Sequence, residues 1–472
     1  VNWGESTFIQ NGISVINPID VTAFRRPGSE IKEALVPVNM FYLSQNLTDN
    51  LSAEGFYQLE WDQTVVDNCG TFFSQPDVVA DGCTQNLAVL TNNAASIRTL
   101  NGLLGPNLAV TPSPWNEGLV VKRGPDRDAR DSGQYGFSLK YFADSLNTEF
   151  GGYYMNYHSR LPIFSGRGAD ASKVAQINQL ITNIARISPS LAAQAGAAAM
   201  AGNSSYFIEY PEDIRLYGLS FSTTLPTGTA WQGEISYRPN APVQLNTTDI
   251  LYSGLDPVSI GGNHVYDNAS VLTGNAGQDL HGYRRKEVTQ LQTTFTHFFD
   301  QVMGAERLTL VGEVGWTHVG GLESQNKARY GRDPVFGPGP LNGSLNGRPT
   351  CEALNVSTLG TANANNVSRN CESEGFTTAD SWGYRARAIW DYNDVFAGVN
   401  LKPNVAWSHD VDGYSPGPGG NFEEGRKAVS LGIDADYLNT YTASLAYTNY
   451  FDGKYSTVDD RDFVSLSFGV TF

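Results

Sequence analysis

The chain has 472 residues and a net charge of −17, from 48 acidic and 31 basic residues. This acidic excess excludes nucleic acid as an expected partner, because neutralising phosphates requires a surplus of Lys and Arg. No apolar stretch reaches the roughly 18 residues that a transmembrane helix needs. With 49 Gly, 23 Tyr and 23 Phe beside 17% charged residues, two classes remain: a soluble β protein, or a membrane β-barrel whose apolar stripe alternates with polar positions.

The N-terminal range 1–35 begins with VNWGESTFIQNG and is expected to hold one strand followed by a polar segment, for which the barrel lumen is one location. Downstream, apolar residues alternate with polar ones in runs of about ten residues, the length with which a tilted strand crosses a bilayer. These runs cover 51–61, 135–141, 231–238, 308–317, 382–391, 395–407, 429–437 and 464–472.

The connections between the runs alternate between two kinds. Short polar turns are expected at 47–50, 145–148, 226–229, 301–306, 393–394 and 438–440. Long segments are expected near 62–131, 163–211, 241–283, 321–379 and 412–426. Short periplasmic turns and long external loops are typical of outer-membrane barrels. We therefore predict an all-β fold in which residues 36–472 form an antiparallel transmembrane barrel that crosses the outer membrane many times.

The direction of the strands sets a minimum for their number. The strand near 36–46 and the last strand both point towards the periplasm, so thirteen strands cannot close with every pair antiparallel. We predict fourteen or more strands, with VNWGESTFIQNG as the missing one. Residues upstream of Val1 would add strands in pairs and give sixteen.

Four cysteines fall into two close pairs, Cys69 with Cys83 and Cys351 with Cys371. Neither pair has CxxC spacing or a neighbouring His, and both lie in polar external segments. Two local disulfides formed in an oxidising compartment are the expected result.

The polar positions of the strands carry charges of both signs, which the alternation directs into the lumen. The predicted lumen-lining residues are Glu54, Lys140, Glu234, Arg238, Glu313, Arg385, Arg387, Lys402, Asp434 and Asp436. Opposed charges in an open pore favour polar, oriented solutes. The same charges could instead pair and fill a narrow lumen, and the sequence leaves both possibilities open.

One external segment has helical spacing. Val174, Ile177, Ile181 and Ile184 form an apolar stripe that predicts a helix over 171–187, and Pro189 is expected to end it. The residues 85–104 show a weaker pattern of the same kind. The helix either stiffens the loops or folds over the barrel mouth as a constriction.

No motif indicates catalysis, a metal site or a cofactor. Neither HExxH nor GxSxG occurs, and the six His residues are scattered along the chain. We expect a protein that is not an enzyme.

The segments VNWGESTFIQNGISVINPID, YPEDIRLYGLSFST and DRDFVSLSFGVTF resemble an uncharacterised family of large Gram-negative outer-membrane β-barrels, known chiefly as a domain of unknown function. The resemblance implies an outer-membrane barrel that handles hydrophobic compounds, and it brings no catalytic residues. Phe472 matches the terminal aromatic residue by which such barrels are recognised for insertion.

We therefore expect an outer-membrane channel or transporter that passes a small or hydrophobic molecule without covalent chemistry. The alternative is a non-transporting barrel whose external loops bind a partner. The expected surroundings are outer-membrane lipid and lipopolysaccharide, with the external loops or the periplasmic face as places for a protein partner.

Overall fold

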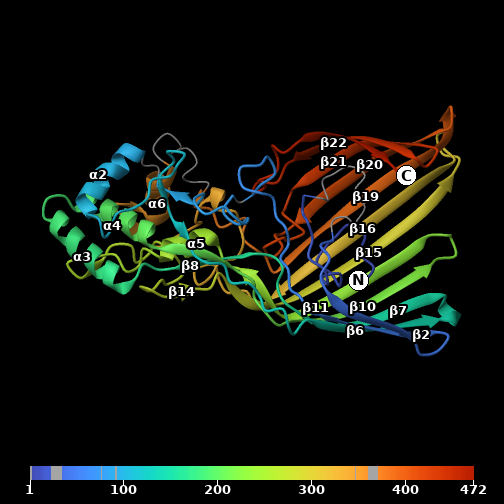
Figure 1. Ribbon diagram of the computed structural model, residues 1–472, viewed down its shortest axis with the longest axis horizontal. Helices are drawn as coiled ribbons and strands as arrows, with labels where there is room; N and C mark the ends of the chain where they lie inside the picture. Colours follow the sequence, from blue (N-terminus) through green and yellow to red (C-terminus); the bar gives the residue numbers. More distant parts are fainter. Residues whose placement is uncertain are drawn as a thin grey trace.

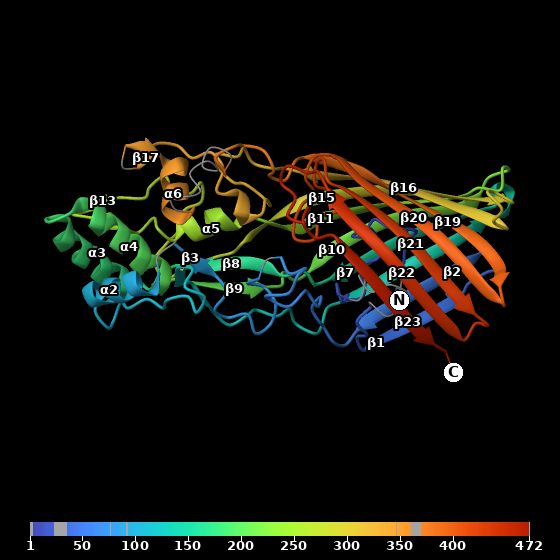
Figure 2. The same cartoon turned by 90° about the horizontal axis from the view of Figure 1, so that it is seen from above.

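The computed structural model describes residues 3–22, 35–75, 77–90, 93–345, 347–359 and 370–471. The molecule is elongated, with a wall of long strands at one end and a group of short helices at the other (Figure 1). Seen from above, the strands are inclined to the long axis (Figure 2). The predicted insertion signal, Phe472, lies outside the described residues, and so do residues 23–34 of the predicted N-terminal range.

The wall is one antiparallel sheet of thirteen strands. Each strand pairs with the strand of this sheet that comes next along the chain. The strands are β1 (Met40–Asn46), β2 (Leu51–Gln58), β6 (Tyr135–Ala143), β7 (Thr148–Tyr157), β10 (Ile214–Thr224), β11 (Ala230–Gln244), β15 (Tyr283–Asp300), β16 (Arg307–Gly320), β19 (Asp380–Phe396), β20 (Val399–Asp412), β21 (Lys427–Tyr437), β22 (Tyr441–Phe451) and β23 (Phe463–Val470).

The expected strand at the N-terminus is not found among the described residues, because residues 3–22 contain no strand. Their backbone N–H groups bond instead to carboxylates of the wall. A segment bound in this way cannot also pair with a neighbouring strand.

The two faces of the sheet differ in polarity because successive side chains of a strand point to opposite sides. In β23, Val464, Leu466, Phe468 and Val470 are 59–77% exposed, whereas the serines between them are less exposed. Tyr, Phe and Trp continue this exposed apolar band over the other strands. None of the described helices is long and apolar enough to span a membrane. An apolar band on the outside of an antiparallel sheet is the lipid-facing surface of an outer-membrane β-barrel.

Short hairpin turns lie at one end of the wall and the long connections at the other (Figure 1). The turn between β19 and β20 lies at Ala397 and Gly398, whereas the sequence pattern indicated 393–394. Ala397 and Gly398 have φ values of 50° and 83°. Two successive positive φ angles are typical of the tight turns that match the twist of hairpin strands.

The long connections fold together beyond the wall. Their helices are α2 (Ala94–Leu104), α3 (Ala171–Ala185), α4 (Pro189–Asn203), α5 (Thr247–Ser253) and α6 (Thr350–Leu359), with 3-10 turns at η2 (Asp144–Leu146), in a hairpin, and η3 (Pro334–Phe336). Their short strands are β3 (Ala88–Val89), β4 (Leu119–Val120), β5 (Lys122–Arg123), β8 (Ile163–Arg167), β9 (Ser205–Glu209), β12 (Ser259–Ile260), β13 (Asn263–His264), β14 (Asp279–Leu280), β17 (Ser344–Leu345) and β18 (Arg348–Pro349).

The helix at 171–187 is present as α3, but it does not cover the barrel mouth. Its stripe of Val174, Ile177 and Ile181 is buried in a cluster that α4 shares, at the end of the molecule far from the wall (Figure 1). Pro189 does not only end one helix: it occupies the first turn of α4, where its missing N–H has no cost. Of the two roles considered for this helix, the position of α3 agrees with packing among the loops, because α4, which the sequence pattern missed, shares the cluster that buries the stripe.

Candidate functional site: the N-terminal plug

Residues 3–18, called the plug from here on, lie against the inner face of the wall. The dark-blue N-terminal segment lies among the strands in Figure 1. Trp3, Ile9 and Ile13 are at most 2% exposed, although no strand or helix holds the segment. What fixes the plug is therefore its contacts with inward-facing side chains.

Glu313 on β16 holds the middle of the plug. Its carboxylate accepts the backbone N–H groups of Thr7 at 3.0 Å, Phe8 at 2.6 Å and Ile9 at 2.8 Å. The hydroxyl of Thr294 on β15 donates a further bond at 3.1 Å. Glu313 is 1% exposed, and a carboxylate that leaves water needs such a set of donors.

Glu234 on β11 holds the plug at two further points. It accepts the backbone N–H of Glu5 at 2.5 Å and that of Ile13 at 2.9 Å. The plug wraps so closely around this carboxylate that a Cβ on Gly4 would lie 2.2 Å from it and one on Gly12 would lie 1.8 Å from it. Gly4 also has a φ of 90°, which disfavours a side chain. The two glycines make the close approach possible.

Arg238 and Glu54 also bind the plug. Arg238 on β11 donates to the carbonyl oxygens of Asn11 at 2.7 Å and Gly12 at 2.6 Å. Trp3 donates its indole N–H to Glu54 on β2 at 2.7 Å, and Lys140 lies 3.6 Å from the same carboxylate. Wall carboxylates thus meet plug N–H groups, while a wall guanidinium meets plug carbonyls.

Glycines on the inner face of the wall give room to three of the buried apolar side chains of the plug. A Cβ on Gly136 of β6 would lie 2.9 Å from the Trp3 ring. A Cβ on Gly218 of β10 would lie 2.7 Å from Ile13, and one on Gly315 of β16 would lie 2.7 Å from Ile9. These three positions, called the sockets, shape the wall to the plug.

The external loop that connects β20 and β21 also contacts the plug. Asn421 donates to the carbonyl of Gln10 at 2.8 Å, and Asn11 donates to that of Gly419 at 2.8 Å. The plug is therefore bound both by the wall and by an external loop.

The other predicted lumen residues do not contact the plug through any hydrogen bond found among the described residues. Arg385 pairs with Asp410 at 2.7 Å, and Lys402 lies 3.8 Å from Asp391. Asp434 accepts a bond from Asn404 at 3.1 Å, and Asp436 accepts the backbone N–H of Asn439 at 3.2 Å. Arg387 is half-buried on β19. The structure therefore divides the ten predicted residues: Glu54, Lys140, Glu234, Arg238 and Glu313 gather at the plug, and the remaining five lie on β19–β21.

Both expected disulfides are formed, Cys69–Cys83 and Cys351–Cys371. Within the described residues, no group of three or more His, Cys, Asp or Glu side chains is arranged to hold a metal ion.

The sequence pattern did not identify the plug as a bound element, because the segment has neither strand nor helix periodicity. The sequence did contain one signal of a bound segment. Glycines occupy inward positions of β6, β10 and β16, and their lack of side chains leaves space at the inner face for such a segment. Which segment fills these sockets could not be inferred, since the contacts join residues that are distant in the chain, such as Ile13 and Glu234, which are 221 positions apart.

The family model described as "Protein of unknown function (DUF1302)" matches residues 1–472. The chain belongs to this family.

Solved structures of outer-membrane proteins are similar over most of the chain. A Pseudomonas aeruginosa FadL homologue is 10% identical with a TM-score of 0.30, over 93% of this chain and 78% of that one. The ferric enterobactin receptor PfeA of the same organism is 12% identical with a TM-score of 0.27, over 87% of this chain and 50% of the receptor. The ferric-catecholate import receptor Fiu of E. coli is 13% identical with a TM-score of 0.28, over 91% and 60%.

The chain thus spans about half the length of the enterobactin receptor. No curated protein matches the chain significantly.

Proposed function

We propose that the protein is an outer-membrane transporter for a small or hydrophobic molecule, with the plug as its gate and no covalent chemistry. One observation carries the proposal: the plug is attached to the wall non-covalently, through backbone N–H groups bound to Glu234 and Glu313.

The chemistry of the contacts supports reversible release. When the plug moves away, water entering the lumen can solvate the carboxylates of Glu234 and Glu313. The plug's own N–H groups would then also bond to water. Neither partner is left as a buried, unsatisfied polar group, which is the main penalty for breaking such contacts.

A tether between the plug and the wall tests the proposal. Thr7 Oγ1 lies 3.4 Å from Thr294 Oγ1, so a Thr7→Cys/Thr294→Cys pair is placed to form a disulfide. We expect the oxidised pair to abolish solute flux in a liposome assay and mild reduction to restore it. The single variants and the wild type, treated with the same reductant, control for the two native disulfides.

Equal flux through the oxidised and reduced pair would contradict the gate. The alternative function, a non-transporting barrel that binds a partner at its external loops, predicts no flux in any state of the tether. In that case the plug would be a permanent part of the lumen.

A further inference from the structure

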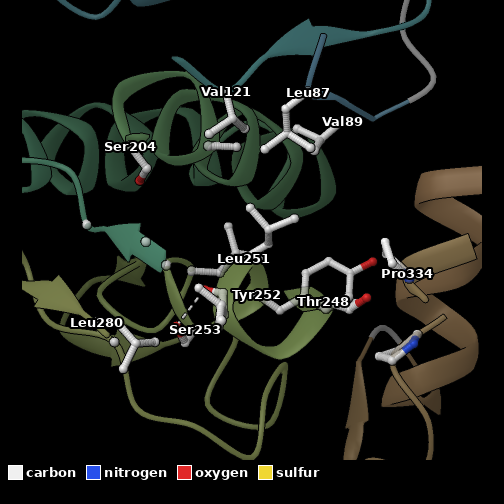
Figure 3. A pocket seen from close by; sticks show the side chains of 18 of the residues that line it. Leu87, Val89, Val121, Ser204, Thr248, Leu251, Tyr252, Ser253, Leu280 and Pro334 are labelled. Carbon is white, nitrogen blue, oxygen red and sulfur yellow. Dashed lines mark hydrogen bonds between the residues drawn. The ribbon is translucent and has the colours of Figure 1, made fainter. Parts of the chain in front are cut away.

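A cavity of about 460 Å³ lies among the external connections, away from the plug. The residues that line it are mostly apolar and come from segments far apart in the sequence. Six of the lining residues are Leu87, Val89, Val121, Ala201, Leu251 and Leu280. Figure 3 shows Leu87, Val89 and Val121 on one side, facing Leu251 and Tyr252 of α5, with Pro334 on a third side.

The cavity is lined by members of two apolar clusters. One cluster contains the buried faces of α2, α3 and α4, and the other contains Tyr206, Val243 and Ile250. Val89 and Ala201 pack against both clusters. Protein cores are normally packed without such gaps, and apolar cavities hold water poorly. The volume is within the range of small-molecule sites.

The lining of the cavity reaches the exposed surface at η3. Val335 lines the cavity and is 63% exposed. Entry of an apolar molecule at this edge would not require it to cross the sheet.

The charges around the cavity favour a ligand without charge. The acidic lining residues are Glu117 and Asp279, and Arg167 is the one basic residue among the described residues that line it. Arg167 already pairs with Asp279 at 2.9 Å. An anionic head group would lie near carboxylates, and the basic side chain of the lining is already paired. A cationic ligand would have to leave water for a largely apolar lining.

We propose that this cavity is a binding site for an uncharged, largely apolar molecule with a single polar group such as a hydroxyl. Ser204 and Ser253 line the cavity and donate their hydroxyl hydrogens to the carbonyls of Met200 and Ile250. Their oxygens keep lone pairs that can accept a bond from a ligand hydroxyl. The site deepens the proposed transport function by naming a ligand class, but binding to it requires no movement of the plug.

The experiment is calorimetric titration of the full chain in nanodiscs, with protein-free nanodiscs subtracted. The probes are dodecanol, dodecanoate and dodecyltrimethylammonium, which share one chain length. We expect dodecanol to bind at least roughly tenfold more tightly than either ion. An ion that binds as tightly as the alcohol would overturn the assignment of an uncharged ligand.

Two variants that change the size of the cavity in opposite directions locate the binding. Ala201→Leu should weaken dodecanol binding roughly tenfold, the effect of excluding about two methylene groups, and should favour shorter alcohols. Leu251→Ala should shift the preference towards longer alcohols, a gain that a misfolded protein would not produce. Ala175→Leu is the control, at an exposed position of α3.

Unchanged dodecanol binding and unchanged chain-length preference in both cavity variants would overturn the site. The result is independent of the gate: alcohol binding that follows cavity size supports the site even when the tethered plug leaves flux unchanged. In the same way, a working gate with no alcohol binding would overturn the site alone.

Discussion

Removing the charge from both plug-binding carboxylates should open the lumen. In the double variant Glu234→Gln/Glu313→Gln the side chains keep their shape, but five backbone N–H groups of the plug lose a charged acceptor. Hydrogen bonds to charged groups contribute about 1.5–3 kcal/mol and neutral ones about 0.5–1.5 kcal/mol. The loss is therefore about 1 kcal/mol for each bond.

The five losses do not simply add, because the bonds share two acceptors. We expect the plug to be held less tightly by about 3–4 kcal/mol in total. At 1.4 kcal/mol for each factor of ten, the ratio of released to bound plug should rise roughly hundred- to thousand-fold. Each amide also brings an NH₂ group towards N–H donors of the plug, which acts in the same direction.

Single-channel recording in planar bilayers measures this ratio as the fraction of time spent open. Asp434→Asn is the matched control, since Asp434 is a carboxylate of β21 that bonds to Asn404 rather than to the plug. Heat-modifiable migration on gels shows whether each variant has folded. An open fraction for the folded double variant no higher than that of the control would refute the role of these carboxylates.

Two further predictions concern the wall and its external edge. Leu466→Arg should destabilise the inserted barrel by about 2–4 kcal/mol because Leu466 is 62% exposed on the lipid-facing side. Ser467→Arg should be tolerated because Ser467 lies on the inner face. Unfolding of the two variants in urea from liposomes measures both effects, and equal losses of stability would contradict the orientation of β23. Burial alone would raise the pKa of Glu323, but hydrogen bonds from Lys286, Tyr330 and Arg284 lower it from 4.5 to about 2. Glu323→Gln should therefore reduce thermal stability at neutral pH, and the difference from the wild type should shrink as pH falls from about 4.5 to about 2; a difference that is constant over this range would contradict the ionic contribution.

The wall was predictable from the sequence because its physics is local. Strands have a period of two, so the alternation from Val464 to Val470 already distinguishes the outward face from the inward one. The same local rule identified the cysteine pairs as loop disulfides, since each pair closes a short segment. The hairpin at Ala397 and Gly398 was placed wrongly because Asn393 and Asp394 are also common turn residues, and the pairing of β19 with β20 decided between the two positions.

The plug and the helices were less predictable because their partners are distant in the chain. The stripe of α3 was recognised, but the Ala-rich α4 that covers it has little amphipathic pattern of its own. The plug contacts inward-facing residues of at least four strands of the wall. No local sequence pattern identifies a segment that is held by side chains of other segments. The alternation predicted an inward position for charges such as Glu234 and Arg238, but it gave no information about which plug groups they would bind.

The plug combines two kinds of contact that respond differently to release. On release, water replaces the plug N–H groups at the carboxylates, which requires little free energy. The sockets, in contrast, lose apolar contacts when Trp3, Ile9 and Ile13 leave them. Burial of apolar side chains contributes about 1.5–3 kcal/mol each, so the sockets also oppose release and limit how far the loss of the two charges shifts the equilibrium. In the proposed gate, a solute with apolar surface would occupy the same sockets once the plug is displaced and would lower the free energy of the open state. We therefore expect the proposed gate to respond most readily to molecules that can replace the plug's own side chains.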